Sequence, residues 1–128
     1  MHMWQAGKQP RVLVADGDEQ ALAQTVQRLD RAGYDVLVAR DGEEAVARAT
    51  AEHPDVCLID AMTPKLTGYD VTRRLRADPR TCDVPVLLMT ALAHESSGTL
   101  DSGADACMRT PCSPHELRAR VRALLARG

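Results

Sequence analysis

The sequence predicts a single α/β domain, built as a doubly wound, five-stranded parallel sheet with helices on both faces. Short apolar runs alternate five times with longer amphipathic segments, which is the pattern of repeated strand–helix units. The run at 55–60 holds four consecutive apolar residues, as expected of a central parallel strand that is covered on both faces. The length of 128 residues suits one domain with a sizeable core. That core must be aliphatic, because the chain has no Phe.

The five strands are predicted from short runs rich in β-branched and aliphatic residues. Pro85 lies near the start of the fourth run, where a missing backbone donor is tolerated. In chain order the predicted strands are 11–15, 35–39, 55–60, 84–89 and 105–109.

Helical periodicity and capping signals place a helix after each strand. Asp18 is predicted to cap the first helix, and Asp41 with Glu44 has the spacing of a capping box at the second. Ser113 is the predicted cap of the last helix. The fourth helix is predicted to be weak, because it contains a Ser-Ser-Gly sequence. The helical segments are 18–32, 41–53, the region around Val71 and Leu75, 94–101, and the region from 113 onward, whose core stripe is Leu117, Val121, Leu124 and Leu125.

Composition and charge argue against several classes of function. A net charge of −2 gives no long-range attraction for nucleic acid or an anionic membrane, so no direct nucleic-acid contact is expected. No apolar run has the length of a membrane span and no signal peptide is recognisable, so a cytoplasmic location is expected. Residues 1–10 are predicted to be a tail, in which Met1-His2-Met3 resembles a cloning scar, and residues 11–128 the domain. Four cysteines without CxxC spacing are predicted to be reduced core or loop residues: Cys57, Cys82, Cys107 and Cys112.

Two carboxylates and two hydroxyls are predicted at the carboxyl ends of the strands, where such sheets place their sites. These residues are Asp16, Asp60, Thr90 and Thr110. Clustered carboxylates need a cation, a proton or hydrogen bonds to persist. Mg²⁺ prefers such oxygen ligands, and a carboxylate can act as a nucleophile toward phosphorus. The alternative is that Asp60 has no chemical role and is a strand-end acid satisfied by hydrogen bonds.

Four motifs in order resemble the receiver domains of two-component response regulators. Residues 12–16 resemble the first strand of that family, and residues 55–64 followed by Gly68 resemble its phosphoacceptor strand and loop. Residues 87–91 resemble the hydroxyl-bearing fourth strand, and Gly103-Ala104-Asp105 with Pro111 resembles the fifth-strand region, where the peptide before the proline is usually cis. The resemblance covers about residues 11–126 and implies a flavodoxin-like fold with strand order 2-1-3-4-5.

Carried over by position, the resemblance makes Asp60 the candidate phosphoacceptor and Thr90 the candidate switch hydroxyl. It implies a weak metal site formed by Asp16, Asp60 and the Met62 carbonyl, so Mg²⁺ is at most weakly held and no other cofactor is expected. A sensor kinase is the implied partner. Gly68 is expected to supply a positive φ angle in the loop.

The sequence departs from the family at positions that serve phosphorylation. Gly17 stands where the family has a second acidic residue, and Thr110 stands where it has a lysine. Cys107 replaces the switch aromatic, and Cys112 replaces a frequent Phe. The segment between Thr90 and Gly103 is also about two residues shorter than the family pattern. These departures predict impaired or absent phosphorylation.

The leading hypothesis is an atypical receiver that acts as a signalling and protein-interaction module, controlling an attached or separate output such as transcription. The alternatives are a working phosphoacceptor with altered Mg²⁺ ligation and a receiver regulated by a small molecule. An enzyme is not expected, although Asp16-Gly17-Asp18 has the D-x-D spacing of haloacid-dehalogenase-like phosphatases, because the chain is short and has no matching lysine.

A homodimer through the fourth helix, fifth strand and fifth helix is a further expectation, because charges of both signs occur there. The alternative is a solvated surface that contributes little. These charged residues are Asp101, Asp105, Glu116, Arg118, Arg120 and Arg122.

Overall fold

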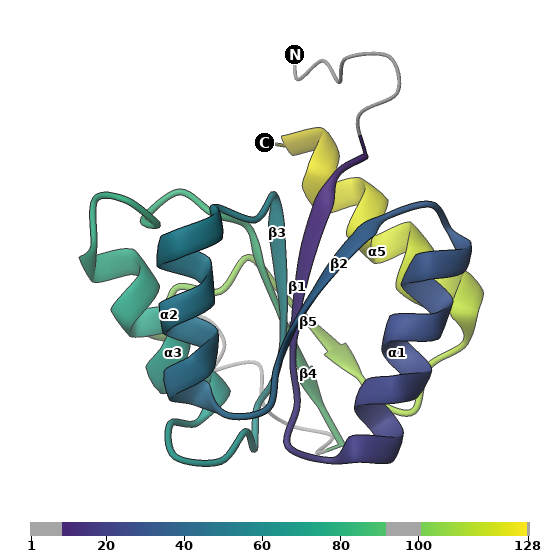
Figure 1. Ribbon diagram of the computed structural model, residues 1–128, viewed down its shortest axis with the longest axis horizontal. Coiled ribbons are helices and arrows are strands. Elements are labelled where there is room, and N and C mark those ends of the chain that lie inside the picture. Colours follow the sequence, from purple (N-terminus) through teal and green to yellow (C-terminus); the bar gives the residue numbers. More distant parts are fainter. Residues whose placement is uncertain (1–8, 92–100, 128) are drawn as a thin grey trace.

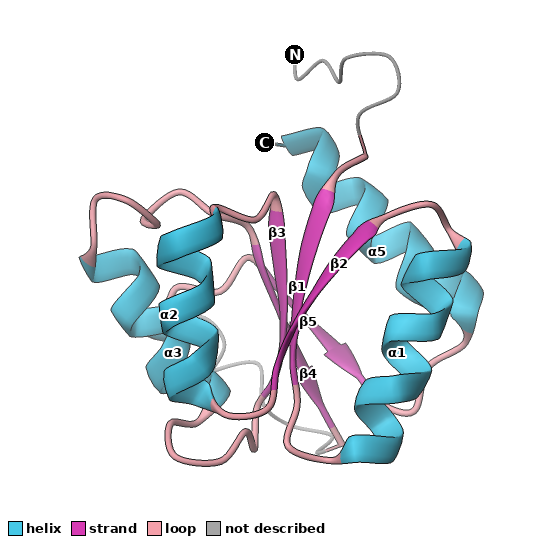
Figure 2. Ribbon diagram, in the orientation of Figure 1, coloured by secondary structure: helices cyan, strands magenta, loops and turns pink. Residues whose placement is uncertain are grey.

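A central parallel sheet separates two helical layers in the computed structural model, which describes residues 9–91 and 101–127 (Figures 1 and 2). The strand order β2-β1-β3-β4-β5 is the predicted one. Helices α1 and α5 cover one face and α2 and α3 cover the other, as Figure 1 shows. The elements are β1 (Arg11–Ala15), α1 (Glu19–Arg31), β2 (Asp35–Ala39), α2 (Gly42–Glu52), β3 (Val56–Asp60), α3 (Gly68–Ala77), β4 (Val86–Thr90), β5 (Ala106–Arg109) and α5 (Pro114–Arg127). Most of the predicted weak helix at 94–101, and the tail at 1–8, lie outside the described residues.

Alternating strand residues divide the core into two aliphatic layers. In β3, Val56 and Leu58 point toward α1 and α5, whereas Cys57 and Ile59 point toward α2 and α3. This alternation is the period-two geometry of a strand that is buried on both faces. The predicted stripe of α5 is buried against the first layer, with Leu117, Val121, Leu124 and Leu125 all under a tenth exposed.

Side-chain caps begin the helices where the sequence places them. The Asp18 carboxylate accepts from the backbone N–H of Gln20 and caps α1. Asp41 accepts from the N–H of Glu44 at α2, but the Glu44 carboxylate accepts from Arg40, one residue before the cap. The Ser113 hydroxyl accepts from the third residue of α5, as predicted. These contacts satisfy N–H groups that a helix leaves without partners in its first turn.

Strand boundaries differ from the prediction by one or two residues. β4 begins at Val86 rather than at residue 84 and includes Thr90. Pro85 has no N–H to donate, although its carbonyl accepts from Cys57. β3 and β5 each begin one residue later than predicted, so Asp55 and Asp105 lie just before the strands.

The expected role of Gly68 was wrong. Positive φ occurs among the described glycines at Gly33 and Gly103, whereas Gly68 begins α3 with an ordinary φ. A Cβ at position 68 would lie 2.7 Å from the Asp60 carbonyl oxygen and 2.9 Å from a methyl of Leu88. Glycine is needed there because the helix start packs closely on the end of β3.

No helix in the described part of the chain is long and apolar enough to cross a membrane.

Candidate functional site

A cavity of about 550 Å³ lies where the carboxyl ends of β1 and β3 meet α1 and the β5–α5 loop. Strand order reverses beside β1, and ligand sites of doubly wound sheets lie at such a switch. Of the four predicted strand-end residues, Asp16, Asp60 and Thr110 line this cavity. Thr90 does not: it ends β4 with only 3% exposed. The other lining residues are Asp18, Ala21, Gln24, Thr25, Arg28, Met62, Met89, Ala91, Pro111, Cys112 and Leu117.

Asp60 and Asp16 form the acidic end of the cavity. One Asp60 oxygen accepts from the Met62 N–H at 3.1 Å, and Asp16 Oδ1 accepts from the Asp18 N–H at 2.9 Å. Burial, followed by the negative charges of Asp16 and Asp18, raises the pKa of Asp60 from 3.8 to about 6. Burial also raises the pKa of Asp16, against the effect of its hydrogen bond from Asp18. Holding both acids ionised is therefore unfavourable.

The basic side chains near the acidic end contact other residues than Asp16 and Asp60. Lys65 Nζ lies 3.5 Å from Asp41, and Arg28 on the cavity wall donates to the Cys112 carbonyl at 2.9 Å. Throughout residues 9–91 and 101–127, no lysine or arginine forms an ion pair with Asp16 or Asp60. Among the described residues, therefore, no cation pairs with the acidic end.

Position 17 is closed by a proline ring as well as lacking a carboxylate. A Cβ built on Gly17 would lie 2.5 Å from both Cδ and Cγ of Pro64, in the β3–α3 loop. That loop is held in place, since the Pro64 carbonyl accepts from the Gly42 N–H at 2.8 Å. A side chain at position 17 would therefore require the two loops to separate.

The remaining predicted positions lie around β5. The peptide between Thr110 and Pro111 is cis, as the resemblance implies. The Thr110 N–H donates to the Thr90 carbonyl at 2.8 Å, so the two hydroxyl residues are adjacent through the backbone. Cys107 is half-buried within β5, and Cys112 lines the cavity. All four cysteines are free thiols, as predicted, and burial raises the pKa of the Cys57 thiol to about 12.

The residues present do not form a full magnesium site, because the second acidic residue of the family pattern is missing. Asp16, Asp60 and the Met62 carbonyl are the available oxygens, and Gly17 supplies no carboxylate. Within the described residues, no group of three or more His, Cys, Asp or Glu side chains is arranged to hold a metal ion. Asp18 does not fill the gap, because its carboxylate is used to cap α1.

Several lining residues were missed by the sequence prediction. Arg28, Met89 and Leu117 read as ordinary helix or strand residues, and only the folded chain brings them to the cavity wall. Arg28 contacts Cys112, which is 84 positions away, so no local pattern could signal the contact. The face that α1 turns to the cavity carries Asp18, Ala21, Thr25 and Arg28 at helical spacing, which is the signal that could have been used.

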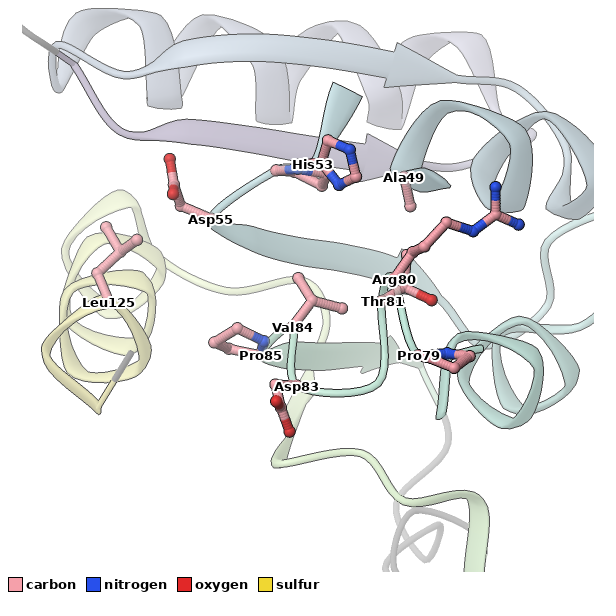
Figure 3. A pocket seen from close by; sticks show the side chains of 11 residues that line it. Ala49, His53, Asp55, Pro79, Arg80, Thr81, Asp83, Val84, Pro85 and Leu125 are labelled. Carbon is pink, nitrogen blue, oxygen red and sulfur yellow. The ribbon is translucent and has the colours of Figure 1, made fainter. Parts of the chain in front are cut away.

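The opposite end of the sheet has a different arrangement. Figure 3 shows a smaller cavity, of about 270 Å³, bounded by the residues before β3 and β4, the end of α2 and Leu125 of α5. Nearby, Asp105 accepts from Arg76 at 2.8 Å and from the Val86 N–H at 2.8 Å. Arg76 also donates to the carbonyls of Cys82, Val84 and Gly103.

This fold and its strand-end acids define a receiver-type signalling domain. Residues 12–122 match the family described as the response regulator receiver domain, and the chain belongs to that family.

Relatives with curated names are transcriptional regulators rather than enzymes, as the sequence predicts. The chain is 45% identical over 121 residues to the DNA-binding dual master transcriptional regulator RpaA of Synechocystis sp., which covers 92% of this chain and 50% of that protein. It is 41% identical over 120 residues to the alkaline phosphatase synthesis transcriptional regulatory protein PhoP of Bacillus subtilis, covering 92% of this chain and 49% of that protein. The chain therefore spans about half the length of these relatives.

Solved structures agree with the fold. The receiver domain of Francisella response regulator 1452 is 36% identical, with a TM-score of 0.83, and the match covers 92% of this chain and 98% of that one. The receiver domain of a sensor histidine kinase from Pseudomonas aeruginosa is 26% identical, with a TM-score of 0.86, covering 93% and 99%. That structure holds a magnesium ion in its active site cleft.

Proposed function

We propose that this receiver acts as a signalling and protein-interaction module in which phosphorylation of Asp60 is impaired or absent. The observation that carries the proposal is the acidic end of the cavity, where Asp16 and Asp60 have no ion-pair partner in the described chain. Gly17 and Thr110 occupy the positions where the family resemblance implies a further carboxylate and a lysine.

The size of the impairment follows from the missing charges. A phosphoryl group brought to Asp60 adds negative charge to a crevice that already raises the pKa of that carboxyl. Each charge-assisted contact missing from such a site costs about 2 to 4 kcal/mol of transition-state stabilisation. Two missing contacts therefore slow phosphorylation by several orders of magnitude.

The output is proposed to be transcriptional control. The relatives that support this are named as transcriptional regulators and are about twice as long as this chain. A sensor kinase and an output domain or partner protein are the proposed partners, in a cytoplasmic setting.

A homodimer through β5, α5 and the segment before β5 is part of the proposal. Some charged residues of this surface already form ion pairs within the chain: Asp105 pairs with Arg76, and Glu116 lies 3.8 Å from Arg120. Arg118 and Arg122 remain as exposed candidates for a partner's acids. Sedimentation that shows only monomer at high concentration would remove the dimer from the proposal.

Intact-mass measurement with acetyl phosphate and Mg²⁺ tests the impairment. The expected result is little or no addition of roughly 80 Da, the mass of one HPO₃ group. The Thr110→Lys variant is the matched comparison, since it restores one cation beside the cavity and should label faster. Rapid, stoichiometric labelling of the unaltered chain that is lost in Asp60→Ala would sink the proposal.

A working phosphoacceptor is the second candidate function. The strand-end placement of Asp60 and its hydrogen bond from the Met62 N–H favour it, because a nucleophilic carboxylate is present and oriented. This candidate predicts the labelling that the first excludes, so the same experiment separates them.

A further inference from the structure

The acidic cavity has the dimensions of a small-molecule site. Its volume of about 550 Å³ lies within the range of pockets that take drug-sized ligands. A metal ion with its waters would need only the acidic end. The rest of the cavity therefore has room for a larger, organic ligand.

Asp16 is the more deeply buried of the two carboxylates at the acidic end. It is only 8% exposed, and its Oδ1 accepts the Asp18 N–H. Within the described residues Oδ2 accepts no hydrogen bond, yet no enclosed side-chain oxygen there is left without a partner. Asp16 lines the cavity, so a ligand's donor there can reach its carboxylate.

Apolar side chains form the wall that continues from the acids. Met89 and Leu117 are nearly fully buried and line the cavity, together with Ala21 and Pro111. Met62 is 70% exposed at the same cavity, and it is the one large hydrophobic side chain exposed to that degree in the described part of the chain. An apolar group lying on this wall would remove the exposed surface of Met62 from water.

Helix α1 fixes the length and polarity of the cavity. Asp18 and Arg28 both line it and are ten residues apart, which is about 15 Å along a helix. The acids therefore lie at one end and the only cation among the lining residues, Arg28, lies toward the other. A ligand that matches this order has its positive group at the acids.

We propose that this cavity binds an organic monocation, an ammonium or guanidinium joined to an apolar body. Its cationic group donates to Asp16 and Asp60, and its body lies against Met89 and Leu117. The inference deepens the proposed function and rests on it in one respect: a phosphoryl group on Asp60 would compete for the same space. Such a ligand supplies the positive charge that the described residues do not place beside these acids.

Benzylammonium chloride is a suitable probe, with benzyl alcohol as its neutral counterpart. Methyl NMR spectra of the full chain, recorded without a phosphodonor, follow the signals of Ala21, Met89 and Leu117. We expect saturable shifts at millimolar benzylammonium, and at least about tenfold weaker binding of benzyl alcohol. Asp16→Asn should weaken benzylammonium binding by about tenfold, whereas Asp83→Asn, in the cavity at the opposite end of the sheet, should not change it.

Equal binding of the alcohol and the ammonium would overturn the proposal, as would an unchanged affinity in a folded Asp16→Asn protein. Absence of shifts up to about 10 mM probe would do the same. Displacement of benzylammonium by an equal concentration of Mg²⁺ would show an inorganic cation site instead. Labelling of Asp60 by acetyl phosphate would overturn only the proposed function, because the NMR experiment contains no phosphodonor.

Discussion

Two aspartates at opposite ends of the same sheet, Asp105 and the half-buried Asp60, have opposite surroundings. Asp105, before β5, accepts from the Arg76 guanidinium and the Val86 N–H, and lies 3.6 Å from Arg127. Asp60, at the end of β3, accepts from one backbone N–H and faces the charges of Asp16 and Asp18. Within residues 9–91 and 101–127, the cations of the chain thus pair with Asp105 and leave Asp60 without an ion pair.

Under the proposed function, this is the difference between a structural charge and a functional one. Arg76 and Asp105 connect α3, the residues before β4 and the residues before β5, so their attraction favours the folded state. The acids around Asp60 repel one another and oppose folding, and such a cost persists where function requires it. Removing charge should therefore destabilise one end of the sheet and stabilise the other.

The largest expected effect is the loss of Arg76. Arg76→Met keeps an apolar stem but leaves three backbone carbonyls without their donor and Asp105 without its nearest cation. Since both side chains are about a quarter exposed, the free energy of unfolding should fall by about 3 kcal/mol. Urea denaturation measures this value. Arg80→Met removes the exposed pair with Asp78 and is the control, which should leave the urea midpoint almost unchanged.

Filling position 17 should have the next largest effect. Gly17→Ala places a methyl group against the Pro64 ring and should lower the free energy of unfolding by about 2 kcal/mol. The same substitution in a Pro64→Ala background should cost less, because the obstructing ring atoms are gone. A double-mutant cycle in urea with no coupling between the two positions would contradict the contact.

Neutralising Asp60 should give a smaller, stabilising effect that depends on pH. A carboxyl with a pKa raised from 3.8 to about 6 binds more protons in the folded than in the unfolded state between those values. Stability therefore falls as the pH rises through this range and stays lower above it. Asp60→Asn should raise the free energy of unfolding by about 1 kcal/mol at pH 7.5, and by much less at pH 4. An equal effect at both pH values would argue against the raised pKa.

Much of the fold could be predicted from the sequence because its signals are local. Capping by Asp18, Asp41 and Ser113 depends on residues within one turn. The central strand is indicated by four consecutive apolar residues. The strand-end acids could be placed because parallel strands end at one edge of the sheet.

Other features depend on contacts between distant segments and had no local signal. Pro64 closes over Gly17 only when two loops meet, and Gly68 is required by the packing of α3 on β3 rather than by its φ angle. Thr90 is at the predicted strand end, but its burial against the neighbouring elements keeps it from lining the cavity. Arg28 reaches the site through its contact with Cys112.

The titration of Asp60 itself tests the central claim most directly. ¹³C NMR of the Asp60 side-chain carboxyl, recorded from about pH 3 to 8, reports its protonation without any reaction. An uncompensated acidic crevice predicts a pKa of about 6, with little change on addition of millimolar Mg²⁺. A pKa near the ordinary 3.8 would show that a cation already neutralises this crevice, and a large decrease with Mg²⁺ would show that the metal binds there; either result would contradict the account.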